Sequence, residues 1–375
     1  MKEAIAIRLF EQSGALLRGG LCALGLLLLT SCARSDLAPI ASATPEPTAQ
    51  ATQEPQSLVS GSAGSGVTAG EKSSGFGFYF DTVVSVTLYD ADETLLSDIW
   101  AMCDRYEKLL SKTVEGSDVY RINHADGETV TVDPETWTIL SRAKEMNALS
   151  GGAFSVTIAP VVALWDFTGG TERMPTAAEL EQTLPLVDDT KLVLGENSTV
   201  TLPAGMSIDL GGIAKGYIAN QVADLVSARS SGSAMSFGGN TYVTGTKPSG
   251  AAWSIGIQDP NSDTGTPLLV ISLDEGTVVT SGVYERYFFR DGVRYHHILD
   301  PQTGISAQTG LLSATVVGLD SMAADAFATC CIVLGPEKAI SLLEAQGQDG
   351  LLILEDGSIL YTEGFAQKYA LRSYQ

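Results

Sequence analysis

From about residue 80, the pattern of apolar and polar residues predicts first a strand and then a helix. Residues 83–89 are rich in β-branched side chains, which is typical of a strand. Apolar residues then recur at helical spacing from Leu95 to Leu110, so we expect a helix there. Asp90 and Glu93 precede this run and predict a capping box at its start.

The rest of the chain mixes short strands with helices. Further helices are expected from Pro134 to the glycine pair at 151–152, over about 213–228, over 322–334, and from Pro336 onward. Strands are expected at 191–194, 199–202 and 206–209, and as short pieces across 234–294. This order is typical of an α+β fold and not of a repeating βαβ unit. No second linker interrupts it, so we expect one compact catalytic domain of mixed sheets and helices over 76–375.

The N-terminus has the pattern of a secretion signal. A weakly basic start leads into an almost wholly apolar run at 21–29, followed by the sequence Leu-Thr-Ser-Cys that ends at Cys32. This ending resembles a bacterial lipobox, so we expect a signal peptide at 1–31 and a lipid on Cys32. The alternative, an uncleaved membrane anchor, needs roughly 20 apolar residues, more than this run provides. We therefore expect the protein on the extracytoplasmic face of the cell membrane, held by a lipid anchor.

The composition of the chain predicts a linker and argues against nucleic acid as a partner. Residues 32–75 begin with the lipidated cysteine and are otherwise rich in Ala, Ser, Thr, Pro, Gly and Gln, which predicts a flexible linker. The chain is 44% hydrophobic with a formal net charge of −22. Such an acidic chain is a poor ligand for nucleic acid. Of the cysteines, Cys103, Cys330 and Cys331 would remain in the folded part, and we expect no disulfide framework from them.

A glycine turn marks the first candidate site. In the run 209–217 a strand-like segment ends at Asp209, turns through Gly211 and Gly212, and enters a helix that carries Lys215. Glycines let backbone approach a ligand closely, and a helix N-terminus favours anions. The motif therefore predicts either a phosphate-binding turn or an ordinary tight turn before a helix.

Three further segments carry candidate chemistry. Asp325 and Thr329 share one face of an apolar helix, and a carboxylate with a hydroxyl suits Mg²⁺. The alternative is a solvated face, or Thr329 bonding back to its own helix. His296 and His297 adjoin a turn signal and are either an acid–base site or a packed pair. Arg286 is a candidate for holding an anionic group, unless its segment is a plain sheet edge.

In their order, these motifs resemble the ApbE-type FAD:protein FMN transferase family. The resemblance runs from Phe80 to the C-terminal helices. The matching pieces are SDVYRIN at 117–123, GAF at 152–154, PVVALW at 160–165, DLGGIAKGY at 209–217, GGN at 238–240, IQDP at 257–260, TSG at 280–282, YERY at 284–287, HHI at 296–298, DP at 300–301, TG at 303–304, and Asp325 with Thr329. Members of this family are commonly lipoproteins, in agreement with the N-terminus.

The resemblance implies a Mg²⁺-dependent reaction in which FAD gives FMN to a Thr or Ser hydroxyl of a target protein and AMP leaves. It implies metal binding by Asp325, Thr329 and the main-chain carbonyl near Gly212. It implies His297 as the catalytic base or proton-transfer group. It implies FAD contacts at the positions Asp209, Lys215, Ala153, Phe154, Ser155, Thr113, Phe80 and Leu299. The target would be an extracytoplasmic flavoprotein, such as a respiratory-complex subunit or a secreted flavin-binding reductase.

Three of these positions depart from the family pattern. Ser155 stands where the family usually has Asp, Thr113 where an aromatic residue is common, and Phe80 where other members have Met. A contact of Ser155 with FAD is therefore changed. The metal residues, Lys215 and His297 match.

Other functions remain as alternatives. Some members of the family hydrolyse FAD to FMN and AMP, and a lipoprotein that binds flavin without catalysis would keep the same pocket. Ser141 and Lys144 match the S-x-x-K motif of penicillin-interacting acyl transferases, although no Ser-Asp-Asn element accompanies them. Release of AMP distinguishes the flavin enzymes from the other two.

Overall fold

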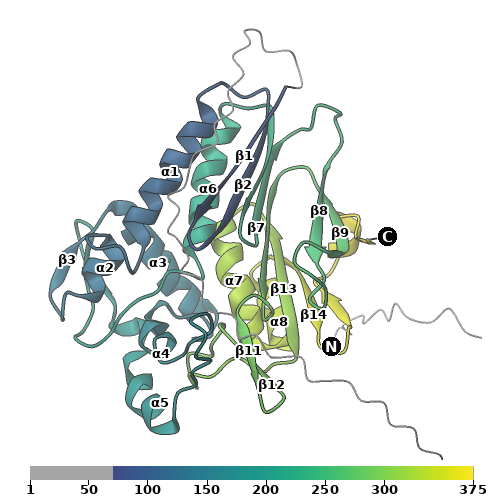
Figure 1. The fold of residues 1–375 in the computed structure, drawn as a ribbon. Coiled ribbons are helices and arrows are strands. Elements are labelled where there is room, and N and C mark those ends of the chain that lie inside the picture. The colour runs from purple at the N-terminus through teal and green to yellow at the C-terminus, as the bar shows by residue number, and fades with distance from the viewer. Residues whose placement is uncertain (1–70, 375) are drawn as a thin grey trace, which may run out of the picture. The chain divides into compact units, whose positions relative to one another are not determined.

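The computed structural model describes residues 71–374, and its centre is an antiparallel sheet of eight strands (Figure 1). The strands lie in the order β1-β2-β6-β7-β10-β13-β14-β15. Their bounds are β1 Lys72–Tyr79, β2 Thr82–Tyr89, β6 Gly232–Phe237, β7 Asn240–Gly245, β10 Gly276–Gly282, β13 Leu311–Gly318, β14 Asp349–Leu354 and β15 Ile359–Tyr361. With helices beside it, this sheet agrees with the predicted α+β class.

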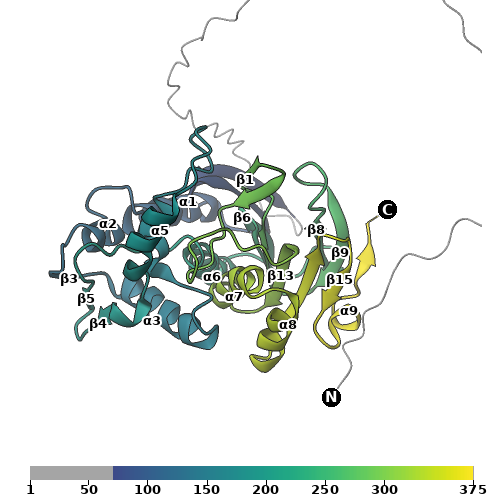
Figure 2. The ribbon, with the colours of Figure 1, turned by 90° about the horizontal axis from the view of Figure 1, so that it is seen from below.

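One face of the sheet is covered by helices (Figure 2). They are α1 (Leu95–Leu110), α6 (Ala214–Ser227), α7 (Ser321–Leu334) and α8 (Pro336–Ala345), and α3 (Pro134–Leu149) packs on α7. Helix α7 packs on β10 and β13 and also contacts α3, α6 and α8. Being covered on several sides explains why α7 is apolar around nearly its whole circumference.

The other face of the sheet is partly covered by a smaller sheet. Strands β8 (Trp253–Gln258), β9 (Pro267–Leu273) and β16 (Arg372–Ser373) form it in the order β16-β9-β8, and α9 (Phe365–Lys368) lies next to it. A second apolar cluster fills the space between the two sheets, from Val278 and Val317 of the large sheet to Ile271 of the small one.

The remaining elements surround one end of the helical layer. They are α2 (Asp118–Asn123), α4 (Ala159–Val162), α5 (Ala177–Thr183), the sheet β3-β5-β4 (Thr129–Thr131, Thr199–Thr201, Val193–Leu194), three short 3₁₀ turns (Val156–Ile158, Leu184–Leu186, Asp189–Lys191) and the hairpin of β11 (Tyr287–Arg290) and β12 (Val293–His296). One side of the hairpin packs on Trp165 and Phe167.

The predicted helices are confirmed within a residue or two, but the predicted cap of the first one is wrong. Asp90 has a positive φ of 50° and accepts hydrogen bonds from the Glu71 amide and the Ser231 hydroxyl. Its carboxylate therefore ties the strand ends together. Helix α1 begins after Thr94, whose side chain makes no capping bond.

The predicted strand at 206–209 is also wrong. The backbone of Ile208 bonds to the amide side chain of Asn123, with distances of 2.7 Å from its N–H and 3.0 Å to its carbonyl. Asn123 thus takes the place of a neighbouring strand. At the N-terminal side, β1 begins at Lys72, before the Phe76 that the pattern indicated.

The predicted signal peptide, the lipidation of Cys32 and the linker up to residue 70 lie outside the described residues. Within 71–374, no helix has the length and apolarity needed to cross a membrane. Cys103, Cys330 and Cys331 are buried free thiols.

Candidate functional site

The glycine turn before α6 lies against α7. The amide of Gly216 donates a hydrogen bond of 3.0 Å to Asp325 Oδ2. A Cβ on Gly216 would lie 2.2 Å from the Ser321 carbonyl oxygen, so only glycine permits this approach. A Cβ on Gly212 would lie 3.5 Å from Thr329 Oγ1 and 3.2 Å from the Phe154 ring. The turn and the helix therefore bring the predicted metal-binding positions together.

Asp325 is a nearly buried carboxylate with a cation beside it. The residue is 4% exposed, and Lys215 Nζ lies 3.9 Å from its Oδ2. Lys215 Nζ also donates to the Gly211 carbonyl at 3.0 Å. A buried carboxylate is costly unless charges or hydrogen bonds compensate it. A second cation next to Asp325 would therefore further stabilise its buried negative charge.

Thr329 lies on the same face of α7 and turns toward β10. Its Oγ1 is 3.5 Å from the Ser281 hydroxyl, rather than bonded back to its own helix. Within residues 71–374, no three His, Cys, Asp or Glu side chains cluster as a metal site. A metal at this place would therefore depend on hydroxyl and carbonyl oxygens together with Asp325.

Asp209 is ionised and paired with a residue that the sequence did not single out. Lys112 Nζ lies 2.6 Å from Asp209 Oδ2, and the Gly211 amide donates to Oδ1 at 2.8 Å. Burial raises the pKa of the Asp209 carboxyl, but Lys112, the Gly211 amide and the Arg286 charge lower it more, so its pKa lies below the usual range. Lys112 precedes Thr113, so the loop after α1 reaches the site.

The two histidines have different surroundings. His296 is buried, and its Nε2 is 3.0 Å from the Ala307 carbonyl, so it is a packed side chain. His297 Nδ1 is buried and has no hydrogen-bond partner in the described part of the chain. Burial, followed by the charge of Arg286, lowers the pKa of His297 to about 3, and Lys215 acts in the same direction. His297 is therefore a neutral imidazole among the cations of the site.

A second carboxylate lies where Ser155 departs from the family pattern. Ser155 Oγ donates to Asp189 Oδ1 at 2.5 Å, and Asp189 also accepts from the Val156 and Thr157 amides. Ala153 and Phe154, directly before it, are buried. A cavity of about 320 Å³ opens here. It is lined by Asn147, Gly152, Ser155, Leu184, Val187, Asp188, Asp189, Pro301 and Gln302.

The other three predicted FAD positions, Phe80, Thr113 and Leu299, make their recorded contacts with other residues. Phe80 is in the β1–β2 turn, where its amide donates to Glu107 Oε1 at 3.0 Å. Thr113 is exposed and bonds to the Ser111 hydroxyl. Leu299 is buried beside Val161 and Trp165. The FAD contacts of these three residues stay predictions.

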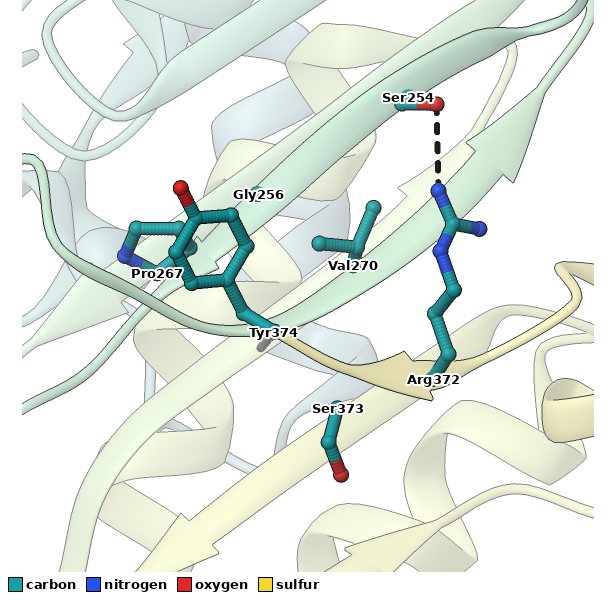
Figure 3. Close-up of a pocket in the computed structure, with 7 residues that line it drawn as sticks. All are labelled: Ser254, Gly256, Pro267, Val270, Arg372, Ser373 and Tyr374. Atoms are coloured by element: carbon teal, nitrogen blue, oxygen red, sulfur yellow. Dashed lines mark hydrogen bonds between the residues drawn. The ribbon is translucent and has the colours of Figure 1, made fainter.

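A cavity of about 760 Å³ lies elsewhere (Figure 3). It opens over the small sheet, where Arg372 bonds to the Ser254 hydroxyl at 3.3 Å. No residue that the sequence predicted for the site lines it. The rival S-x-x-K motif lies on α3, where Lys144 Nζ donates to the backbone carbonyl oxygens of Asp189 and Leu192.

Comparison with known proteins identifies the family. A family profile described as ApbE matches residues 80–352. A FAD:protein FMN transferase of Treponema pallidum (strain Nichols) is 36% identical over 291 residues, which cover 73% of this chain and 80% of that protein. One from Klebsiella pneumoniae (strain 342) is 34% identical over 282 residues, which cover 74% and 87%. These relatives are transferases by name, so the prediction of a transferase is confirmed.

Solved structures agree with the sequence comparison. The crystal structure of the ApbE protein from Thermotoga maritima MSB8 is similar with a TM-score of 0.74 and 34% identity, covering 79% of this chain and 99% of that one. The apo form of the Pseudomonas stutzeri flavinyl transferase ApbE gives a TM-score of 0.72 and 27% identity, covering 81% and 99%. The predicted α+β fold is confirmed by both. In sequence and in fold, the chain belongs to the ApbE family.

Proposed function

We propose that this chain is a Mg²⁺-dependent FAD:protein FMN transferase that modifies a Thr or Ser hydroxyl of a target flavoprotein and releases AMP. The names of its relatives support the activity. The observation that carries the chemistry is the meeting of Gly212, Thr329 and Asp325 beside Lys215 at the junction of α6 and α7.

The residues at this junction fit a magnesium ion. Asp325, Thr329 and the Gly212 carbonyl would hold it, since Mg²⁺ takes oxygen ligands. One oxygen of Asp325 is fixed by the Gly216 amide, so the carboxylate is oriented before a metal arrives. Bound there, the ion would neutralise charge on the FAD pyrophosphate and on the departing AMP.

Other residues of the chain would bind and orient FAD. Lys215 supplies a cation at the start of α6, where backbone N–H groups also favour an anion. Asp209 is ionised and holds Lys112 at 2.6 Å, which brings a second cation to the same turn. These two lysines would reduce the repulsion between a bound pyrophosphate and the buried carboxylate of Asp325.

His297 would take the proton of the acceptor hydroxyl. The acceptor oxygen forms a bond to the FMN phosphorus, the bond from that phosphorus to the bridging oxygen breaks, and AMP leaves with that oxygen. The imidazole is neutral in the free protein, because burial and the charges of Arg286 and Lys215 disfavour its protonated form. A bound pyrophosphate would offset the part of this effect that comes from the charges and would raise the basicity of His297.

The N-terminal features complete the proposal. Lipidation of Cys32 would hold the enzyme on the extracytoplasmic face of the cell membrane, where the target is a respiratory-complex subunit or a secreted flavin-binding reductase. The sequence at 1–32 supports this location.

The test incubates the full chain with FAD, Mg²⁺ and a protein that carries a flavinylation site. Mass spectrometry detects the FMN adduct, and AMP is counted in parallel. We expect both products, and their loss in Asp325→Asn and His297→Gln but not in Arg372→Gln. AMP with free FMN and no adduct would assign the chain as a hydrolase, and intact FAD in every sample would leave a flavin-binding protein.

A further inference from the structure

The β11–β12 hairpin has two faces of different chemistry. Phe288 and Tyr295 point to one side and pack near Trp165. Because alternate residues of a strand point to opposite faces, Tyr287 and Phe289 point to the other side, where they are 40% and 56% exposed. We call Tyr287, Phe289 and Arg294 the outer face of the hairpin.

Arg294 is held on this outer face by the two aromatic rings. Its guanidinium lies 5.0 Å from the centroid of Tyr287 and 5.4 Å from that of Phe289, its cross-strand partner. Its Nε is buried without a hydrogen-bond partner in residues 71–374. A guanidinium stacked on aromatic rings keeps its N–H edge in the orientation that binds a carboxylate through two hydrogen bonds.

The arginines of the hairpin also differ from those elsewhere in the described region. Arg286, Arg290 and Arg294 form no ion pair within 71–374, although Glu285 and Asp291 are close in sequence. The other arginines, except Arg372, pair with carboxylates. They are Arg105, Arg121, Arg142, Arg173 and Arg229. Arg290 donates to the Glu172 carbonyl at 2.7 Å and lies over Phe288 on the inner side, so Arg294 is the cation of the outer face, and in a chain of net charge −22 it attracts acidic groups.

The hairpin leads directly into the candidate active site. His297 follows β12, and its amide donates to the Arg286 carbonyl at 3.1 Å at the base of the hairpin. The hairpin extends below α7 in the view of Figure 1. The base of the outer face, where Tyr287 pairs with His296, is therefore next to His297 along the chain.

We infer that the outer face of the β11–β12 hairpin docks an acidic segment of the acceptor protein and presents its Thr or Ser to His297. This inference rests on the proposed function, because only a transferase requires an acceptor protein. Aromatic residues and arginine dominate binding at protein interfaces, and opposite charges accelerate encounter. A carboxylate of the acceptor would pair with Arg294.

The test measures binding of short fluorescein-labelled peptides to the full chain by anisotropy, with FAD present. One peptide has a Thr flanked by Asp and Glu, and the matched peptide has Asn and Gln instead. We expect the acidic peptide to bind more tightly, with an affinity that falls as salt rises. Arg294→Gln and Phe289→Ser should each weaken its binding by about fivefold, while Arg372→Gln leaves it unchanged.

Equal binding of the two peptides, or no effect of Arg294→Gln, would overturn the inference. So would a loss of FAD affinity in Arg294→Gln with unchanged peptide affinity, since that result assigns the arginine to FAD. Cosedimentation with phosphatidylglycerol vesicles is measured in parallel. Arg294-dependent binding to the vesicles, without preference for the acidic peptide, would assign the face to a lipid surface instead.

The proposed function is tested separately from the docking. AMP release and formation of the FMN adduct by the unsubstituted chain, with the protein that carries a flavinylation site, report on transfer and need no short peptide. Tight binding of the acidic peptide without AMP release would sink the proposed function and leave the docking face. AMP release without any peptide preference would do the reverse.

Discussion

The ammonium of Lys215 lies 3.9 Å from Asp325 Oδ2, across the junction where α6 meets α7. At this distance the two groups attract each other without a short hydrogen bond, and Lys215 is instead hydrogen-bonded to the Gly211 carbonyl. Asp325 keeps the Gly216 amide as its hydrogen-bond donor. The arrangement leaves a buried carboxylate able to accept a further cation, and it makes Lys215 a competitor for that cation.

Replacement of these two residues should therefore have opposite effects on metal binding. Asp325→Asn removes the charge but keeps an oxygen for the Gly216 amide, so we expect Mg²⁺ binding to be lost with little change in thermal stability. Lys215→Gln removes the competing cation, so we expect tighter Mg²⁺ binding and weaker FAD binding, each by about tenfold. Titration calorimetry with Mg²⁺ alone and with FAD alone measures both. Weaker Mg²⁺ binding in Lys215→Gln would contradict the competition.

Gly216→Ala should separate the two helices. The new methyl would lie 2.2 Å from the Ser321 carbonyl oxygen, and backbone on both sides would have to move. We expect a loss of about 2–4 kcal/mol in the free energy of unfolding and a loss of FAD binding. Denaturant unfolding measures the first quantity. Gly318→Ala is the matched control, because its methyl would meet only the Gln348 side chain, at 3.6 Å.

The stability of the fold should fall as the pH drops from 6.5 to 5. Burial lowers the pKa of His296 to about 4 and that of His297 to about 3, from an ordinary value of 6.5. The unfolded chain therefore binds protons in this range that the folded chain does not, and each proton favours unfolding. We expect a loss of about 2 kcal/mol by pH 5 from His296 alone.

Unfolding free energies measured at several pH values test this expectation. His296→Gln should reduce the slope of stability against pH between 6.5 and 5, whatever its effect at pH 7. Most carboxyl groups titrate below this window, so the histidines dominate it. An unchanged slope in His296→Gln would show that the pKa of His296 is the same in the folded and unfolded states.

Local sequence patterns predicted the structure correctly where the conformation of a segment depends on residues close to it in the chain. The helix spacing that predicted α1 reflects a face buried in the core, and the glycines at 211–212 mark the turn that leads into α6. Asp325 and Thr329 were found because both lie on one helix face. The pattern for residues 83–89 likewise predicted β2.

Local patterns did not predict the contacts that a side chain makes with residues far away in the sequence. Asp90 has the sequence of a helix cap, yet it bonds to Glu71 and Ser231. The alternating run at 206–209 looks like a strand, but the side chain of Asn123 bonds to the backbone of Ile208. Lys112 and its partner Asp209 are 97 positions apart, and no local pattern joins them. Asp189 was missed for the same reason, since Ser155 is 34 positions away.

The pair of Ser155 and Asp189 gives the last prediction. Ser155 Oγ lies 2.5 Å from Asp189 Oδ1, so Ser155→Asp would place two carboxylates in contact. We expect this change to destabilise the fold by about 1–3 kcal/mol at pH 7, because one carboxyl must take up a proton or remain beside a like charge. Its pKa would rise on folding, so the loss should grow as the pH increases from 5 to 8.

A double-mutant cycle separates repulsion between the two residues from other effects of each change. Asp189→Ser alone removes the acceptor of the Val156 and Thr157 amides and should itself be destabilising. In Ser155→Asp/Asp189→Ser the new carboxylate can accept hydrogen bonds from these neighbours without a like charge opposite it. We therefore expect the double variant to be more stable than the sum of the single changes implies, by about 1 kcal/mol or more. Additive effects would mean that the two positions do not share one negative charge at the edge of this cavity.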